Sequence, residues 1–322
     1  MNPLLESDVS VEELPAGNGA ARRKAPTVNG VGSKFDIAQA FRLAVETPAP
    51  MPVKILTPPH GWRLRRCFDL WTFRELVYFL AWRDVKVRYK QTVLGAAWAV
   101  LQPLMTMVVF TVFFGRLGRM EQFSNLPYPV IVFSALLPWQ FFSQAVVQSG
   151  QSLVGSANLI SKVYFPRLAI PLAVVGGTLV DFGISFVVMF ALMLFYGVAP
   201  GWGLLLLPVL VALTLLAVLG VGSLLSSLTV AYRDFRYVAP FLIQLWFFAC
   251  PVAYPLQIVP EAYRQLYAIN PMAGIIEGYR SALLGQPIAW DLLAISGAAS
   301  LCVFAIGIAY FLRVERRFAD IV

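Results

Sequence analysis

The chain has very little of the residue types that carry catalysis and metal binding. It contains one histidine, His60, and three widely separated cysteines, Cys67, Cys250 and Cys302. This supply disfavours histidine-based metal or triad chemistry, a disulfide framework and a thiolate metal site. No lysine follows a glycine, so a nucleotide-binding loop of the Gly-Lys-Ser/Thr type is excluded. Asp-x-Asp pairs and a Gly-x-Ser-x-Gly motif are also missing. Any energy for function must therefore come from another polypeptide.

Charge is also scarce, and long apolar runs take its place. Charged residues make up 13% of the 322 positions and hydrophobic residues 59%, with a mean hydropathy of +0.72. A soluble domain carries about 25% charge. The apolar runs are near ~20 residues, the length that crosses a bilayer as a helix. We expect an all-α, multi-pass membrane protein whose transmembrane domain, 94–322, has six transmembrane helices at about 94–115, 129–149, 168–196, 204–230, 238–256 and 291–312.

The basic residues predict the orientation of these spans. With both termini in the cytoplasm, only four of the 25 basic residues fall outside, namely Arg116, Arg119, Arg264 and Arg280. The net charge of +8 then reflects membrane orientation and requires no nucleic acid. Residues 1–62 are polar and rich in Pro, Gly and Ala, and they lack the basic-then-apolar order of a secretory signal. We expect them to form a disordered or irregular cytoplasmic arm.

Residues 63–93 mix aromatic with basic side chains and lead directly into the first apolar run. This mixture predicts an N-terminal amphipathic helix in the membrane interface, with its aromatic rings among the lipid headgroups and its cations facing water or phosphate. A soluble helical hairpin packed beneath the membrane is the alternative.

A polar stripe interrupts the second apolar run. At ~100° per residue its members fall within a narrow arc; they are Gln140, Ser143, Gln144, Gln148 and Gln151. Such a face meets protein or water rather than lipid, so it predicts either the wall of a conduit or interhelical hydrogen bonds. Asp181 is the one carboxylate deep in a predicted span, with Thr178 and Ser185 on the same face. Such a carboxylate is a functional candidate, although hydrogen-bonded packing is at least as good an interpretation.

The fifth apolar run contains Pro251 and Pro255, and the segment 257–287 that follows it is amphipathic. This segment is too apolar for an ordinary loop and too charged for a span. It predicts a re-entrant helical hairpin on the outer side, between the fifth and sixth spans. Glu277 and Arg280 are three residues apart and could pair on one helix face.

The loop 150–167 between the second and third spans is too short for a domain. Its last part has basic residues flanking an apolar group: Lys162, Val163, Tyr164, Phe165, Pro166 and Arg167. A short helix here would present an apolar knob with a basic rim, which is suited to docking a soluble partner. A plain positively charged turn is the alternative.

Four segments in this order carry a family resemblance: the junction at 83–104, NLISKVYFPR at 158–167, AYRDFRYVAPF at 231–241 and INPMAGIIEGYRSALLG at 269–285. Over residues 63–322 the chain resembles the membrane-spanning subunit of type-two ABC transporters that export polysaccharides such as O-antigen, capsule or teichoic acid. The resemblance implies a homodimer in the bacterial inner membrane, with two copies of a cognate ABC ATPase. Together the two bundles would enclose a channel for an undecaprenyl-pyrophosphate-linked glycan.

The resemblance also implies roles for particular segments. The chain itself would bind no cofactor, because ATP and Mg would belong to the partner ATPase. Residues Lys162–Arg167 would form the ATPase-coupling helix, and 63–93 the interfacial and gate helices. Candidates for contact with the lipid pyrophosphate are Arg83, Arg88, Tyr89 and Lys90, since guanidinium and ammonium groups suit phosphate. Anchoring to anionic membrane lipids is the alternative for each of them.

A polysaccharide path also needs rings that stack on sugar faces and amides that bind hydroxyls. The candidates for the channel lining are Phe110, Phe113, Phe114, Trp139, Gln140, Phe142, Gln144, Gln148, Trp246, Phe247 and Tyr254. Lipid-facing belts and helix packing are commoner fates for aromatic residues. The rival functions are export of drugs or another lipid-linked cargo, a membrane-embedded glycan-processing enzyme, and a structural scaffold.

Overall fold

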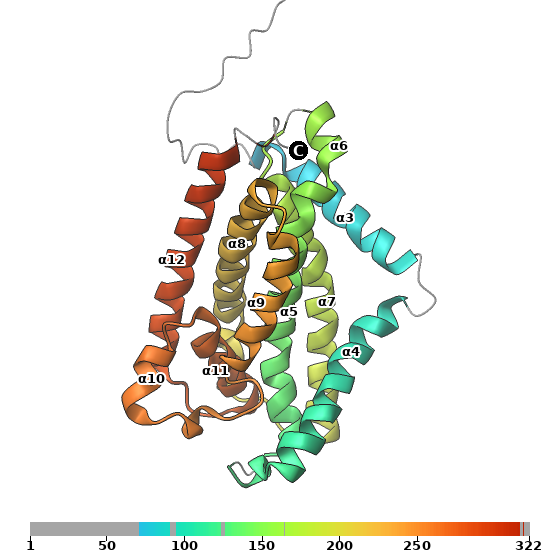
Figure 1. The fold of residues 1–322 in the computed structure, drawn as a ribbon. Coiled ribbons are helices and arrows are strands. Elements are labelled where there is room, and N and C mark those ends of the chain that lie inside the picture. Colours follow the sequence, from blue (N-terminus) through green and yellow to red (C-terminus); the bar gives the residue numbers. More distant parts are fainter. Residues whose placement is uncertain (1–70, 91–94, 124–125, 164, 316–317, 319–322) are drawn as a thin grey trace, which may run out of the picture. The chain divides into compact units, whose positions relative to one another are not determined.

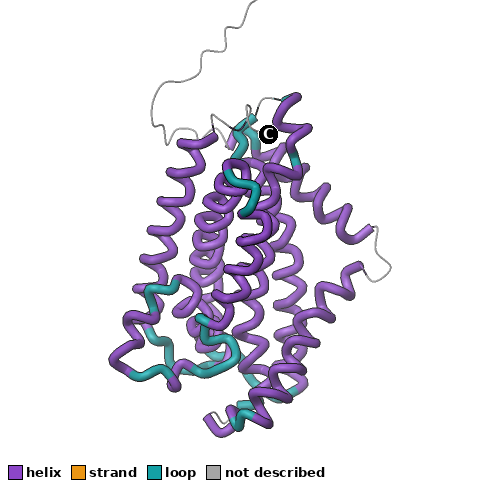
Figure 2. Tube along the Cα trace, in the orientation of Figure 1, coloured by secondary structure: helices purple, strands orange, loops and turns teal. Residues whose placement is uncertain are grey.

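The computed structural model describes residues 71–90, 95–123, 126–163, 165–315 and 318. The chain divides into two units, Met1–Gly61 and Trp62–Val322, and the whole of the first unit lies outside the described residues. The predicted arm 1–62, the first part of the predicted interfacial segment 63–93, and Tyr164 therefore have no structural description. The described part of the second unit is helical, and Figure 2 shows no strand in it.

The helices follow one another in the order drawn in Figure 1. Their bounds are α3 Arg74–Lys90, α4 Gly95–Phe110, η1 Thr111–Leu117, η2 Met120–Phe123, α5 Tyr128–Gly155, α6 Ala157–Lys162, α7 Ala169–Phe195, η3 Trp202–Leu206, α8 Leu207–Ala231, α9 Phe235–Phe248, η4 Leu256–Ile258, α10 Glu261–Tyr267, α11 Pro271–Leu284 and α12 Trp290–Val314. Five segments of the described chain are long and apolar enough to cross a membrane: Ala97–Leu117, Tyr128–Gly155, Ala169–Phe195, Trp202–Ala231 and Trp290–Val314. They coincide with the predicted first to fourth and sixth spans.

The predicted fifth span, 238–256, is not one continuous helix. Helix α9 ends at Phe248 and is only 14 residues long. At 1.5 Å per residue it spans about 21 Å, short of a hydrocarbon core of ~30 Å. The reason is local, because Pro251 has no N–H to donate and disfavours helical geometry at Cys250 before it. A loop, α10 and α11 follow before α12 begins.

Helix α5 is the buried centre of the bundle. It packs against α4, α7, α8, α9 and α11, and Val132, Phe133 and Val146 on it have no exposed surface. Small residues bring the neighbours close. A Cβ on Gly222 of α8 would lie 3.0 Å from the Cβ of Ser149 on α5. Close backbone approach of this kind supplies the van der Waals contact that holds helices together within lipid.

Helices α8 and α12 approach each other even more closely. A Cβ placed on Gly307 would lie 2.0 Å from the backbone oxygen of Gly220. Only glycine fits at this crossing, so the pair fixes the position of α12 against the bundle. We call the end of the bundle that carries α6 and the last turn of α12 the α6 end, and the opposite end, with α10 and α11, the α11 end (Figure 1).

Helix α3 runs from the α6 end along the first half of α7 (Figure 1). Its Ala81 lies against Gly176 and Gly177, which leave room for the crossing. The aromatic rings of Tyr78 and Phe79 point away from the bundle and are exposed. Exposed rings on this helix are compatible with the predicted interfacial position, and the last turn of α3 reaches the middle of α7.

Helix α11 is buried along its whole length. Asn270 ties it to the end of α9: its Oδ1 accepts hydrogen bonds from the backbone N–H of Met272 at 3.1 Å and from Trp246 Nε1 at 2.9 Å, and its Nδ2 donates to the carbonyl of Ala249 at 3.0 Å. At the other end Gly285 adopts the left-handed conformation (φ 67°) that closes many helices. A single side chain thus caps α11 and fixes the loop after α9.

Candidate functional site

A cavity of about 720 Å³ lies between α3, α4, α5 and α7. Arg88 and Tyr89, which line it, belong to the last turn of α3, and this turn meets α7 roughly halfway along the bundle (Figure 1). Its polar lining comes from all four helices: Arg88, Tyr89, Gln102, Gln140, Gln144, Gln148, Thr178, Asp181 and Ser185. Ligand sites in membrane bundles are built in this way, from polar side chains that converge on a space between helices.

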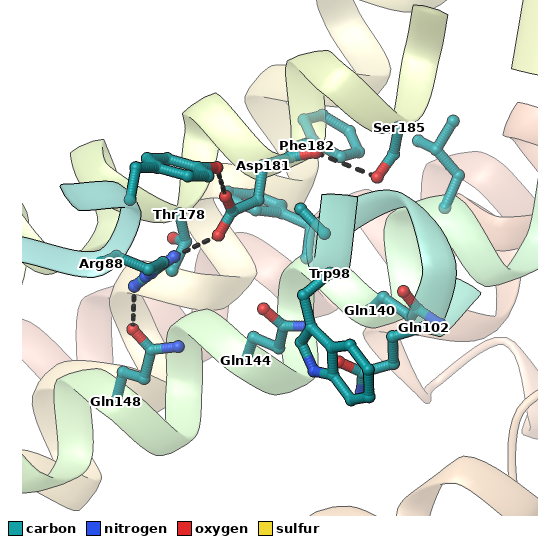
Figure 3. Close-up of a pocket in the computed structure, with 14 residues that line it drawn as sticks. Arg88, Trp98, Gln102, Gln140, Gln144, Gln148, Thr178, Asp181, Phe182 and Ser185 are labelled. Atoms are coloured by element: carbon teal, nitrogen blue, oxygen red, sulfur yellow. Dashed lines mark hydrogen bonds and ion pairs between the residues drawn. The ribbon is translucent and has the colours of Figure 1, made fainter. Parts of the chain in front are cut away.

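Four of these residues form one hydrogen-bonded group, which we call the cavity cluster: Arg88, Tyr89, Gln148 and Asp181. Arg88 Nη1 pairs with Asp181 Oδ2, and Arg88 Nη2 donates to Gln148 Oε1 at 2.6 Å. Tyr89 donates its hydroxyl to Asp181 Oδ1. Figure 3 shows Arg88 lying between the carboxylate and the amide. Both oxygens of the carboxylate thus have a donor from the same turn of α3.

This arrangement explains a carboxylate in the middle of an apolar helix. Asp181 lies near the middle of α7, which runs from Ala169 to Phe195, where an unpaired charge would be costly. Arg88 neutralises it, and Tyr89 adds a second donor. Burial, together with the hydrogen bond to Asp181, raises the pKa of Tyr89 above its usual value, so this hydroxyl keeps its proton at neutral pH.

The neighbouring hydroxyls on α7 do not join the cavity cluster. Thr178 Oγ1 donates to the carbonyl of Val175 at 2.9 Å, and Ser185 Oγ donates to the backbone carbonyl of Asp181 at 2.9 Å. Both bonds stay within α7, which leaves these side chains as polar wall rather than as partners of the charges. Asp181 is therefore hydrogen-bonded to a neighbouring helix, as one of the two interpretations expected, and its partner there is Arg88 on α3, 93 residues away in sequence.

The glutamine stripe forms one wall of the same cavity. Gln140, Gln144 and Gln148 are spaced one turn apart on α5 and all three line the space (Figure 3). In the part of the chain that the structure describes, the side-chain amides of Gln140 and Gln144 have no hydrogen-bond partner. Each amide can both donate and accept a hydrogen bond, so this wall can bind a hydroxyl group as either donor or acceptor.

The wall that α4 contributes to the cavity was not predicted from the sequence. Trp98 and Gln102 are one helical turn apart and line the cavity opposite the glutamines (Figure 3). Trp98 leaves 56% of its surface exposed. Only a weak feature of the sequence points to this wall: Gln102 is the one amide residue in an apolar run, directly before Pro103. An aromatic ring and an amide on adjacent turns of a helix form a surface against which the face of a sugar ring can lie.

The aromatic candidates for a channel lining pack mostly against one another. Phe110 contacts Phe247, Trp139 contacts Phe247, and Phe142 contacts Trp246, with ring centroids 5.2–5.7 Å apart. Phe142 has no exposed surface, so the structure does not support a lining role for it. These rings join α4, α5 and α9, which is a packing role.

The remaining aromatic candidates are spread over two places. Phe113 and Phe114 are exposed on η1. Tyr254 lies near the α11 end, where its hydroxyl is 2.8 Å from that of Tyr267. Of the other pyrophosphate candidates, Arg83 pairs with its neighbour Asp84 at 2.8 Å, and Lys90 is exposed. Neither of these two cations lines the cavity.

The predicted docking knob differs from its sequence-based description. Phe165 is buried, with 5% exposed, in a cluster that includes Leu153, Ile160 and Phe318. Its burial removes the ring from any exposed knob. Of the predicted knob, the exposed residues are Lys162 at the end of α6 and, just after it, Val163, which is 52% exposed. Pro166 is half-buried.

Arg167 is also engaged inside the protein. Its backbone N–H donates to Glu315 Oε1 at 3.1 Å and its Nη1 to the backbone carbonyl of Glu315. The guanidinium carbon lies 5.9 Å from the centroid of the Phe318 ring. The expected basic rim is therefore reduced to Lys162 among the described residues of the loop, and Arg167 fastens the loop to the end of α12.

The predicted pair on α11 is confirmed. Arg280 Nη1 lies 2.7 Å from Glu277 Oε2, and Arg280 Nη2 donates to the carbonyl of Pro251 at 2.6 Å. The adjoining cavity measures only about 30 Å³, room for little more than one water molecule. This buried pair holds the loop after α9 against α11.

The comparisons with known proteins agree with this architecture. The profile of the family described as "ABC-2 type transporter" matches residues 75–284. The chain is 32% identical over 247 residues to the O-antigen export system permease protein RfbA of Myxococcus xanthus, covering 75% of this chain and 94% of the relative.

Two further relatives are similar over most of their length. The RfbA permease of Klebsiella pneumoniae is 27% identical over 262 residues, or 80% of this chain and 99% of the relative. The polysialic acid transport protein KpsM of Escherichia coli is 22% identical over 206 residues, or 63% and 78%. With the profile matching more than half of its length, the chain belongs to the family of ABC-2 type transporters.

Proposed function

We propose that the chain is the membrane-spanning permease subunit of an ATP-driven exporter for a lipid-linked polysaccharide, most simply an O-antigen. Two of the relatives to which the chain is similar over most of their length carry O-antigen export in their names. The observation that carries the proposal is the cavity between α3, α4, α5 and α7, in which four glutamines and Trp98 surround a space of about 720 Å³ next to Arg88.

The chemistry of this lining matches a glycan joined to a phosphate. Sugar hydroxyls both donate and accept hydrogen bonds, and carboxamides do the same. An indole ring can lie against the apolar face of a sugar ring. Arg88 supplies the guanidinium that suits a phosphate of the lipid linkage. A purely hydrophobic drug would leave the amides without partners, at a cost in binding free energy.

The assembly we propose is a homodimer, each copy joined to a separate ATPase that binds ATP and Mg. The α6 end would face the cytoplasm of a bacterial inner membrane. The charges support this orientation, since Arg233, Arg236 and Arg313 lie toward the α6 end and Arg116 toward the α11 end (Figure 1). Helix α9 would make the fifth of six crossings, and the segment 257–287, which contains α10 and α11, would form the re-entrant hairpin between α9 and α12, covered by protein.

Coupling to the ATPase would use the exposed surface of α6. Lys162 and Val163 offer a cation and an apolar contact there, and Phe165 and Arg167 hold the loop in place from within. Force applied to α6 would pass directly into α5, which continues into it through Ser156. A separate motor driving a rigid helix is consistent with a sequence that lacks a Gly-Lys-Ser/Thr nucleotide-binding loop.

Reconstitution with the partner ATPase tests this function. In proteoliposomes an undecaprenyl-linked glycan should stimulate ATP hydrolysis, because the glycan fills the polar cavity and changes the equilibrium of the permease. Hydrophobic drugs should have little effect. Stimulation by drugs but not by glycan would favour a drug exporter of the same fold. Chemical conversion of the glycan by the purified chain without ATPase would indicate a processing enzyme instead.

A further inference from the structure

The described lining of the cavity includes one cation and one anion, and they are bound to each other. The guanidinium of Arg88 is about one-third exposed and the carboxylate of Asp181 less so, and both border the open space (Figure 3). An anionic ligand entering this space therefore meets a cation that already has an anionic partner. The ligand must therefore displace Asp181 from Arg88, or bind without contacting Arg88.

The carboxylate occupies the position that a phosphate would need. Its two oxygens take one donor each, Nη1 of Arg88 and the hydroxyl of Tyr89. Two oxygens of a phosphate ester can accept from the same two donors, because a phosphate oxygen, like a carboxylate oxygen, accepts charge-assisted hydrogen bonds. Gln148 holds the other arm of the guanidinium at 2.6 Å and would keep it oriented during an exchange.

We propose that Asp181 is an internal competitor for the phosphate group of the cargo, so that α3 is latched to α7 until a lipid diphosphate replaces the carboxylate. This inference rests on the proposed function for the identity of the ligand. Asp181 is thereby a specificity residue, because a neutral ligand gains too little from Arg88 to displace it.

The packing of α3 shows what the exchange would release. Two sites hold α3 on α7: the crossing of Ala81 over Gly176 and Gly177, and the pairing of Asp181 with Arg88 and Tyr89 at the last turn. The first is close apolar packing and does not depend on charge. Loss of the second frees the last turn of α3 to swing about the first, which opens the side of the cavity.

The decisive experiment measures binding of farnesyl diphosphate to the complete complex with its ATPase in nanodiscs. Asp181→Asn keeps the shape and removes the charge, so it should tighten binding about tenfold, equivalent to ~1.4 kcal/mol. Arg88→Gln should weaken binding by a similar factor. A purely structural Asp181 predicts weaker or unchanged binding in Asp181→Asn, and this result would overturn the proposal.

A double variant separates a specific latch from a general effect of charge. In the Arg88→Gln background, Asp181→Asn should give no further gain, because the competition takes place at Arg88. An equal gain in both backgrounds would contradict the latch. Glu261→Gln is the matched control, since Glu261 pairs with Arg264 on the surface of α10, far from the cavity. It should leave binding unchanged.

A second measurement uses no change at Asp181 and so does not depend on that variant folding. Spin labels at the exposed positions Val87, near the last turn of α3, and Val187 on α7 report the distance between that turn and α7. Farnesyl diphosphate should change this distance and farnesol should not. An unchanged distance with saturating diphosphate would rule out the release of α3.

Inorganic pyrophosphate distinguishes a lipid headgroup from a free phosphate as the ligand. We expect it to bind more weakly than farnesyl diphosphate; equal binding would contradict a lipid source. The latch and the proposed function fail in different ways. A wrong latch leaves glycan-stimulated ATP hydrolysis intact and removes only the gain in Asp181→Asn, whereas a wrong function removes the stimulation by glycan.

Discussion

Among the residues that the structure describes, the Arg88–Asp181 and Arg280–Glu277 pairs are both buried or half-buried, and their surroundings differ. Arg88 and Asp181 join helices distant in sequence and border a cavity of about 720 Å³. Glu277 and Arg280 lie on one helix, with Arg280 only 3% exposed, beside a space of about 30 Å³. The chemistry of the two pairs is the same. The space beside each pair sets its role: the pair on α11 can only hold structure, and the pair at the cavity can exchange its partner.

The largest effect should come from breaking the α11 pair. Arg280→Leu leaves Glu277 buried without its cation and removes the hydrogen bond to Pro251, so we expect a loss of about 3–5 kcal/mol in folding stability. Thermal unfolding in detergent and the yield of folded protein measure this. The double variant Glu277→Leu, Arg280→Leu should recover part of the loss. Unchanged stability of Arg280→Leu alone would contradict a structural role for the pair on α11.

The two cations of the 150–167 loop differ in a similar way, because Lys162 is exposed and Arg167 is bound to Glu315 within the protein. Lys162→Glu reverses an exposed charge, so folding should be unchanged, and glycan-stimulated ATP hydrolysis should fall roughly tenfold as docking weakens. Arg167→Glu should instead lower the melting temperature, because it removes the guanidinium that donates to the backbone carbonyl of Glu315. Lys162→Glu with normal export would show that α6 does not dock the ATPase through this residue.

The smallest effect should come from the neutral wall of the cavity. Gln144→Leu removes one amide, so half-maximal stimulation by glycan should require ~2- to 10-fold more ligand, the equivalent of one hydrogen bond of about 0.5–1.5 kcal/mol. Ser143→Ala is the matched control: Ser143 is the adjacent residue, does not line the cavity, and donates to a carbonyl of its own helix. Equal effects of the two variants would show that the wall does not contact the cargo.

Features within one helix could be predicted from the sequence. The glutamines of α5 share a face because of helical spacing alone, and Glu277 and Arg280 meet for the same reason. Five apolar helices followed from length and composition. The prolines after α9 were visible, but the predicted span 238–256 ran past them, whereas the helix ends at Phe248.

Features that depend on contacts between distant helices could not be predicted. The partners of Asp181 lie 92 and 93 residues away, and no local pattern reports that distance. Phe165 fitted an exposed knob in the sequence, because no local pattern shows that it shares a buried cluster with Leu153 and Phe318. Trp98 was overlooked since an aromatic residue in an apolar run usually faces lipid or packs.

Transport itself tests the central account most directly. Proteoliposomes holding the chain and its ATPase are loaded with a lipid-linked glycan on the ATPase side, and the glycan reaching the other side is measured with an externally added glycosidase. We expect glycan to cross only when both polypeptides and ATP are present, and Arg88→Gln to reduce the rate. Passage or modification of the glycan by this chain alone, without ATP, would contradict the account.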